Sequence, residues 1–223
     1  MTKANSQKLS KQLLVKLTAA FGVFLLCAIS FVAIADEVQD GDSLKYDEAI
    51  LTAINQQSSP FWDGFFTFIT QLGGGYAAAT IVLVLGGLFI AKRMYKKATV
   101  VAAGIAGAVL INSILKVMFE RARPDLWEHL VTETSYSFPS GHAMMGSAIA
   151  FTVMAICWTS RYRWVSVVVG SLYFVAIGFS RLYLGVHYPT DVLAGWLVSG
   201  AWLLVVVAVV YQKSLLRRLS KTI

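Results

Sequence analysis

Long apolar runs constrain this chain more than any other feature of its sequence. A helix that crosses a hydrocarbon core of roughly 30 Å needs about 20 predominantly apolar residues, and six runs approach that length. Hydrophobic residues make up 57% of the chain and charged residues only 14%, whereas about a quarter of a soluble domain is charged. We therefore predict six transmembrane helices, near residues 17–35, 65–91, 98–115, 142–159, 164–180 and 191–211.

The charged residues indicate how these helices are oriented. If both termini are cytoplasmic, all 12 acidic residues fall outside and 14 of the 19 basic residues fall inside. Lys and Arg concentrate on the cytoplasmic side of membrane proteins, so the net charge of +7 reflects topology and implies no nucleic-acid partner. The inside residues are Lys3, Lys8, Lys11, Lys16, Lys92, Arg93, Lys96, Lys97, Arg161, Arg163, Lys213, Arg217, Arg218 and Lys221.

Residues 1–223 form one predicted helical domain, because the sequence has no internal repeat, low-complexity tract or long polar linker. The first apolar run follows a basic region and ends in Ala33-Ile34-Ala35 before Asp36, so it also resembles a cleavable signal peptide. Its 19 residues are long for that purpose, and we favour an uncleaved first helix. Cys27 and Cys157 fall inside predicted spans, where they act as small packing residues and suggest no disulfide framework.

The outer segment 36–60 is predicted to contain a short amphipathic helix. Asp42 or Ser43 could cap it. Its apolar residues recur at helical spacing and form one stripe: Tyr46, Ala49, Ile50, Ala53 and Ile54. The helix would lie on the outer leaflet or pack over the outer end of the bundle, and the sequence does not separate these alternatives. The second apolar run contains glycines at 73–75, so its helix could start after them.

Five basic residues fall on the acidic, outer side of the chain: Lys45, Lys116, Arg121, Arg123 and Arg181. Lys116 and Arg181 lie at the outer ends of predicted spans, and Arg123 follows Lys116 by seven residues. Three cations at one depth repel one another unless an anion lies between them, so they indicate an anion site. Taken singly, each cation could instead snorkel to lipid phosphates or pair with a nearby acid, of which Glu120, Asp125 and Asp191 are the candidates.

The tetrapeptide Pro-Ser-Gly-His at 139–142 stands at the start of the fourth predicted span. Pro139 suits the first turn of a helix, Ser140 is a good capping residue, and Gly141 lets a ligand approach the backbone. The helix N-terminus, with its free N–H groups and positive dipole end, suits an anion. His142 stands beside it, but this tetrapeptide alone is a weak signal.

A second histidine, His187, lies in the last outer loop and precedes Asp191 by four residues. The carboxylate can accept a hydrogen bond from one imidazole nitrogen, which would fix the tautomer and leave the other nitrogen as a nucleophile. Alone, the pair would be better explained as a buried capping pair. Its convergence with the cations and with His142 favours the chemical reading.

These motifs together resemble those of the type 2 phosphatidic acid phosphatase superfamily. The chain matches K-x6-R-P at 116–124, P-S-G-H at 139–142 and S-R-x5-H-x3-D at 180–191, in order and on one membrane face. The six predicted spans extend the resemblance across most of the chain, and the predicted fold is an all-α bundle of six transmembrane helices, with a short outer-face interfacial helix and both termini in the cytoplasm. The resemblance also implies hydrolysis of phosphoric esters or pyrophosphates.

By this resemblance, His187 would attack phosphorus to form a phosphohistidine, Asp191 would orient its ring, and His142 would protonate the leaving oxygen. The phosphoryl oxygens would be held by Lys116, Arg123, Ser140, Gly141 and Arg181. No cofactor or metal is expected, because the three histidines of the chain show no metal-ligand spacing. His129 is expected to be an ordinary loop residue.

The expected substrate is a lipid phosphate in the bilayer of a bacterial inner membrane, approached from the periplasm or cell exterior. Undecaprenyl pyrophosphate and phosphatidylglycerol phosphate are the favoured candidates by resemblance, and no protein partner is evident. A lipid phosphotransferase would carry the same motifs. A non-catalytic protein that binds lipid phosphates would need the cations but not the acid–base residues.

Overall fold

The computed structural model describes residues 3–220, and side chains for residue 12 and residues 14–212. All of the regular secondary structure in this part of the chain is helical. The helices are α1 (Lys3–Asp40), α2 (Leu44–Asn55), α3 (Pro60–Gln71), α4 (Gly75–Ile81), a π-helical turn (Val82–Gly86), α5 (Gly87–Ala91), α6 (Tyr95–Phe119), α7 (Gly141–Cys157), α8 (Arg163–Tyr183) and α9 (Pro189–Ser220). All six apolar runs thus form helices, with ends that differ from the predicted ones by a few residues or, at α1 and α9, by more.

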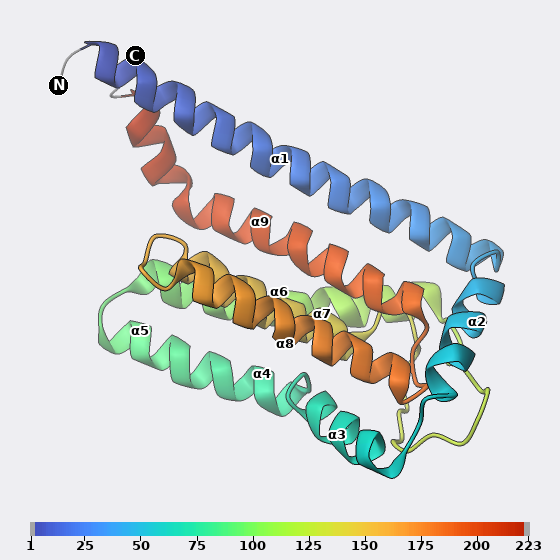
Figure 1. Ribbon diagram of the computed structural model, residues 1–223. Helices are drawn as coiled ribbons and strands as arrows, with labels where there is room; N and C mark the ends of the chain where they lie inside the picture. The colour runs from blue at the N-terminus through green and yellow to red at the C-terminus, as the bar shows by residue number, and fades with distance from the viewer. Residues whose placement is uncertain (1–2, 221–223) are drawn as a thin grey trace.

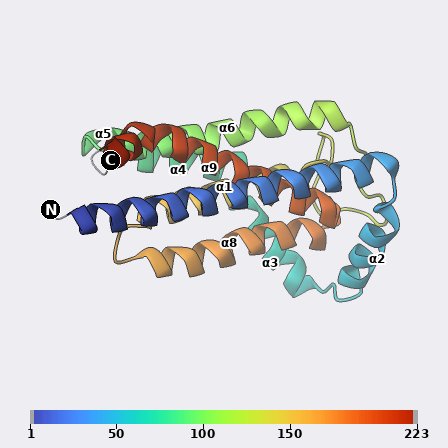
Figure 2. The ribbon, with the colours of Figure 1, turned by 90° about the horizontal axis from the view of Figure 1, so that it is seen from above.

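The long helices run side by side in one elongated bundle (Figure 1; Figure 2). The described ends of α1 and α9 lie together at one end, and α2 crosses the opposite end. α7 packs against α6, α8 and α9, and most of its N-terminal half is buried. It is therefore the central helix, and its N-terminus opens toward the α2 end of the bundle.

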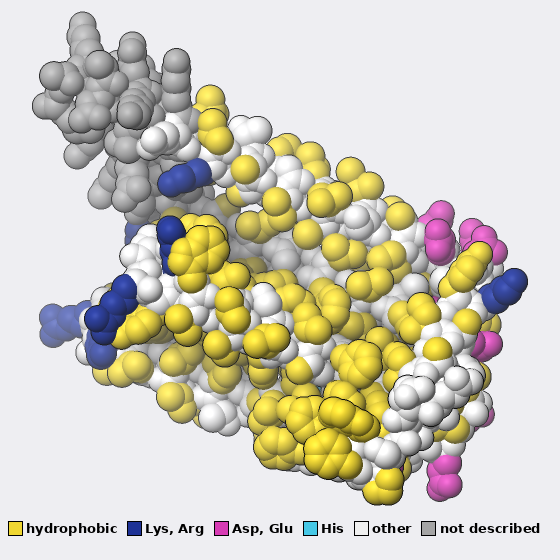
Figure 3. Space-filling view, viewed as in Figure 1, with side chains coloured by type: hydrophobic (Ala, Val, Ile, Leu, Met, Phe, Trp, Pro, Cys, Tyr) yellow, Lys and Arg dark blue, Asp and Glu magenta, His cyan; other side chains and the backbone are white. Residues whose placement is uncertain are grey.

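Within the described residues, four helices are long and apolar enough to cross a membrane: α1 over Leu14–Asp40, α6, α8, and α9 over Pro189–Gln212. The pair formed by α3 and the α4–α5 segment would make a fifth span with a 45° bend. α7 is apolar but has only 17 residues. Large apolar side chains cover the outside of the bundle (Figure 3), as expected for a multi-pass membrane protein rather than a soluble one.

The glycines at 73–75 break the second apolar run, so no continuous helix covers 65–91, and a new helix starts at the last of them, in line with the later start that the sequence left open. The chain turns there, with α3 ending at Gln71 and α4 beginning at Gly75. A side chain at Gly73 would lie 2.4 Å from Ile177 Cγ2, and one at Gly74 would lie 3.5 Å from His142 Nε2. The missing side chains let this bend pack closely against α8 and the start of α7.

Charged side chains separate between the two ends of the bundle (Figure 3). Acidic residues gather at the α2 end and most basic residues at the other. α2 begins directly after Ser43, as predicted, but the Ser43 side chain makes no capping hydrogen bond. Asp47 and Leu51 are its buried residues, whereas Tyr46 on the predicted stripe is 71% exposed. The helix therefore packs over the end of the bundle, and its apolar stripe is only partly covered: Tyr46 and Ile50 are exposed, whereas Ile54 packs against the buried cluster of Tyr183, Leu184 and Val186.

Candidate active site

The three sequence motifs meet at the α2 end of the bundle. Lys116 comes from the last turn of α6, His142 from the first turn of α7, Arg181 from the last turn of α8 and Asp191 from the first turn of α9. Residues 120–140, which join α6 to α7, fold back over these helix ends and hold Arg123 among them. The predicted convergence on one end of the bundle is confirmed.

His187 and Asp191 form a buried pair, 1% and 0% exposed. His187 Nδ1 lies 3.2 Å from Asp191 Oδ2. The same oxygen accepts hydrogen bonds from the Ser137 hydroxyl and from the backbone N–H of Tyr188, the latter at 2.9 Å. The other oxygen, Oδ1, accepts from Arg121 at 2.6 Å. The carboxylate is held on both oxygens, so it can fix the orientation of the imidazole ring.

The other nitrogen of His187 faces a cation. Arg123 Nη1 lies 3.0 Å from His187 Nε2, and since a guanidinium has no acceptor, Nε2 must accept this bond. The proton of the neutral ring therefore resides on Nδ1, toward Asp191. Burial lowers the pKa of His187 well below its ordinary value, and Arg181, Arg123 and Lys116 lower it further. The imidazole is thus neutral at neutral pH, with the Nε2 lone pair directed at the cations.

Glu133 lies at the centre of the cation cluster. Its Oε1 accepts a hydrogen bond from Arg181 and lies 3.8 Å from His142 Nδ1, and its Oε2 lies 3.4 Å from Arg123 Nη2. Burial acts to raise the pKa of Glu133, but Arg181, Arg123 and His142 outweigh it and the pKa is lowered. Glu133 is therefore an internal anion bound by the residues expected to bind phosphate.

Lys116 joins this cluster through the loop that carries Glu133. Its Nζ donates to Ser135 Oγ at 3.0 Å and to the carbonyl of Tyr136. Arg123 Nη2 lies 3.3 Å from the same Ser135 hydroxyl. Arg181, which is 1% exposed, is anchored from the far side because its Nη1 donates to Thr70 Oγ1 at 2.7 Å. The three predicted cations thus surround one small volume.

The Pro-Ser-Gly-His motif shapes the start of α7. Ser140 is the N-cap, and its Oγ accepts a hydrogen bond from Ala143 N at 3.4 Å. Pro139 precedes this cap, so its predicted place in the first turn is wrong. A side chain at Gly141 would lie 3.1 Å from Asn112 Oδ1, and Asn112 Nδ2 holds the Pro139 carbonyl at 3.0 Å. Only glycine therefore fits this close approach without displacing Asn112.

The acidic partners differ from those considered from sequence. Glu120 bonds the Tyr136 hydroxyl at 3.1 Å, not a cation, and Asp191 pairs with Arg121. Nothing in the sequence singled out Glu133, Ser137 or Thr70, because loop folding and long-range packing bring them to the site. Arg121 was noted only as one of the five outer basic residues, without a partner or a role. Among the described residues, no group of three or more His, Cys, Asp and Glu side chains could hold a metal ion. The described cysteines, Cys27 and Cys157, are free.

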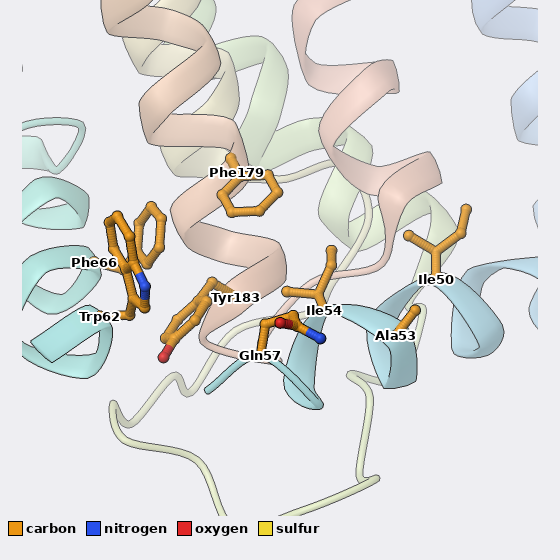
Figure 4. Close-up of a pocket in the computed structure, with 8 residues that line it drawn as sticks. All are labelled: Ile50, Ala53, Ile54, Gln57, Trp62, Phe66, Phe179 and Tyr183. Carbon is orange, nitrogen blue, oxygen red and sulfur yellow. The ribbon is translucent and has the colours of Figure 1, made fainter. Parts of the chain in front are cut away.

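Two pockets adjoin this end of the bundle. A polar pocket of about 640 Å³ runs from the outer end of α6 to the Glu133 loop, lined in part by Lys116, Arg123 and Tyr136. An apolar pocket of about 500 Å³ lies between α2, α3 and α8. Figure 4 shows its aromatic wall of Trp62, Phe66, Phe179 and Tyr183 opposite Ile50, Ala53, Ile54 and Gln57.

The model of the PAP2 superfamily matches residues 97–215 of this chain, which include all of the predicted site residues. The chain belongs to the PAP2 superfamily. Phosphatidylglycerophosphatase B of Bacillus subtilis is 31% identical over 172 residues, covering 74% of this chain and 84% of the relative. Undecaprenyl-diphosphatase of Sulfolobus acidocaldarius is 27% identical over 186 residues, covering 81% of this chain and 84% of the relative.

A solved structure of the same superfamily supports this assignment. The crystal structure of a transmembrane PAP2-type phosphatidylglycerolphosphate phosphatase from Bacillus subtilis superimposes with a TM-score of 0.76 at 28% identity. It covers 85% of this chain and 96% of that protein. The chain is therefore a multi-pass membrane phosphatase with the PAP2 fold.

Proposed function

We propose that this PAP2 protein removes the terminal phosphate from lipid phosphates or pyrophosphates through a phosphohistidine at His187, without a metal. The observation that carries this proposal is the opposed orientation of the His187 nitrogens. Nδ1 faces the buried Asp191, whereas Nε2 faces Arg123 and the cluster of cations around Glu133. A nucleophile needs a fixed ring and a lone pair directed at the phosphoryl site. The geometry fixes the ring and directs Nε2 at the cations, where its lone pair accepts from Arg123 until the phosphoryl group takes that place.

In the proposed reaction, the bond from Nε2 to phosphorus forms as the bond from phosphorus to the lipid oxygen breaks. His142 donates a proton to the departing oxygen, and Asp191 stabilises the positive charge on the His187 ring. Lys116, Arg123 and Arg181 balance the charge on the phosphoryl oxygens, with Ser140 and the Gly141 backbone at the helix N-terminus. A water molecule activated by His142 then cleaves the N–P bond, which releases phosphate and restores the free imidazole.

A lipid is the substrate that best fits the place of the site. The catalytic residues lie at the ends of apolar helices, where a headgroup could reach them while its chains stay in the bilayer. The polar pocket beside Lys116 could admit the headgroup, and the neighbouring pocket with its aromatic wall is suited to hydrocarbon (Figure 4). The relatives favour undecaprenyl pyrophosphate or phosphatidylglycerol phosphate.

The proposed topology places the site at the periplasmic or exterior face of a bacterial inner membrane. It has six spans, with α7 and the bent pair of α3 and α4–α5 counted among them, and both termini cytoplasmic. The separation of acidic from basic side chains along the bundle supports this orientation, because basic residues concentrate on the cytoplasmic side.

A panel of purified lipid phosphates in detergent micelles tests the proposed function. We expect phosphate release without an acceptor lipid, unchanged by a chelator and inhibited by orthovanadate, which mimics a five-coordinate phosphoryl group. Release only in the presence of an acceptor lipid would identify a phosphotransferase. Binding without release from any lipid would identify a non-catalytic lipid-phosphate protein, and release that requires added magnesium would contradict the mechanism.

Removing the charge of Glu133 should strengthen the binding of anions to the site. Glu133 occupies the cations that the phosphoryl group needs, so substrate must displace it. Each charge-assisted hydrogen bond contributes about 1.5–3 kcal/mol, and we therefore expect Glu133→Gln to lower the inhibition constant of orthovanadate by about tenfold or more. The exposed Glu128 lies in the same loop, and Glu128→Gln is the matched control. Unchanged or weaker vanadate inhibition of Glu133→Gln would contradict this displacement.

A further inference from the structure

Asp47, on α2, is a buried acid outside the region matched by the family model. It is 2% exposed and lies 50 residues before residue 97, where that match begins. Its carboxylate accepts from the backbone N–H of Thr190 at 3.1 Å and from the Thr190 hydroxyl at 2.6 Å. It also accepts from Arg121 Nη2 at 2.9 Å. A carboxylate this deeply buried persists only if it is paired, and here the pairing leads toward the candidate active site.

Arg121 connects Asp47 to Asp191. Its Nη2 contacts Asp47, and its Nη1 donates to Asp191 Oδ1 at 2.6 Å and to the Thr190 hydroxyl at 2.8 Å. The guanidinium lies 4.1 Å from the ring centroid of Tyr188, and the side chain is only 11% exposed. A continuous row of buried charges therefore runs from Asp47 through Arg121 and Asp191 to His187.

The signs of the charges on Asp47, Arg121 and Asp191 determine how well a positive charge on His187 is stabilised. A guanidinium carries a fixed positive charge, and Arg121 presents this charge to Oδ1 of Asp191. The net charge of Asp47, Arg121 and Asp191 together is −1, which stabilises a positively charged His187 ring. Without Asp47, Arg121 neutralises Asp191 and the net charge is zero. Charges in a buried site are weakly screened, so the loss of this negative charge would disfavour formation of the positively charged phosphohistidine.

We propose that Asp47 is a positioning residue for the reaction: it neutralises and orients Arg121 so that Asp191 keeps its negative charge for His187. This inference rests on the proposed function. It gives α2 a role in turnover, since the helix carries the acid that completes the row. Asp47 contacts none of Lys116, Arg123 and Arg181 among the interactions described above, so its effect should fall on the chemical step rather than on substrate binding.

The substitution Asp47→Asn tests this role, because Asn keeps the shape and an acceptor for Thr190 but loses the charge. Loss of an orienting partner one shell beyond a metal ligand typically costs about 10- to 100-fold, and we expect a similar loss in kcat with KM changed less than about threefold. A kcat within about twofold of the wild type would overturn the proposal. Wild-type turnover in the same assay tests the proposed function, and the ratio of variant to wild type tests Asp47.

A double-mutant cycle with Arg121→Gln separates positioning from simple support of the fold. If Asp47 acts through Arg121, adding Asp47→Asn to Arg121→Gln should change kcat by less than about twofold. Equal slowing in both backgrounds would overturn the proposal. Leu51→Ala is the structural comparator, because Leu51 is the fully buried apolar anchor of α2. It should lower the unfolding temperature and spare kcat at a permissive temperature, and a loss of kcat matching that of Asp47→Asn would indicate anchoring instead.

Discussion

His187→Ala is expected to abolish phosphate release, with a loss in kcat of at least about 10⁴-fold, as found when a catalytic nucleophile is removed. The reason is geometric. Arg123 directs its guanidinium to Nε2 of this one ring, whereas Nδ1 of the other histidine of the cluster, His142, lies 3.8 Å from Glu133 Oε1, too far for a hydrogen bond that would fix the ring. The measurement is release of inorganic phosphate from a lipid phosphate in detergent.

The variant should keep its fold and its affinity for lipid phosphates, because the three cations remain. His129→Ala serves as the control, since His129 contacts none of the motif residues in the interactions described and is expected to leave turnover unchanged. Residual activity of His187→Ala within about tenfold of the wild type would assign the nucleophile to another group.

Asp191→Asn is the change with the second largest expected effect, a loss of about 10³- to 10⁴-fold in kcat, comparable with loss of the orienting acid in serine proteases. The wild-type carboxylate accepts from Ser137, Tyr188 N–H and Arg121 in addition to facing His187 Nδ1. An amide has only one oxygen for these donors, so its nitrogen would face Arg121 or the imidazole N–H. The ring would lose both its correct tautomer and the negative charge that stabilises its phosphorylated form.

Asp63→Asn is the matched control for this prediction. Asp63 also lies at the α2 end of the bundle, where it accepts a hydrogen bond from the Tyr183 hydroxyl at 2.6 Å, but it contacts no motif residue. We expect it to keep near wild-type kcat. Thermal unfolding of both variants separates loss of chemistry from loss of fold, and Asp191→Asn turnover within tenfold of the wild type would argue against the orienting role.

The sequence was sufficient to predict the convergence of site residues that lie at the ends of transmembrane helices. Lys116, His142, Arg181 and Asp191 each stand at a terminus of an apolar run, and the membrane brings termini of one kind to the same depth. The i, i+4 spacing of His187 and Asp191 likewise predicts their contact. These constraints are local or set by the bilayer, so a single sequence contains them.

Glu133 and Asp47 were beyond such reasoning. Glu133 reaches Arg181 only because residues 120–140 fold back over the bundle, and Asp47 reaches Arg121 only because α2 packs over the ends of α8 and α9. Neither residue has a local pattern that distinguishes it from an ordinary surface acid. The glycines at 73–75 made the start of this helix uncertain from sequence. The reason for glycine at 73 and 74 is the close packing against Ile177 and His142, which are distant in sequence and could not be predicted from it.

Identification of the phosphorylated residue during turnover is the most direct test of His187 as the nucleophile. Enzyme mixed with a lipid phosphate labelled in its terminal phosphate would be quenched with alkali, which preserves phosphohistidine, and mapped by peptide. We expect the label on His187. It should form at least as fast as the product and should be absent from His187→Ala. Product formation at the wild-type rate with no label on His187, or with label on another residue, would contradict it.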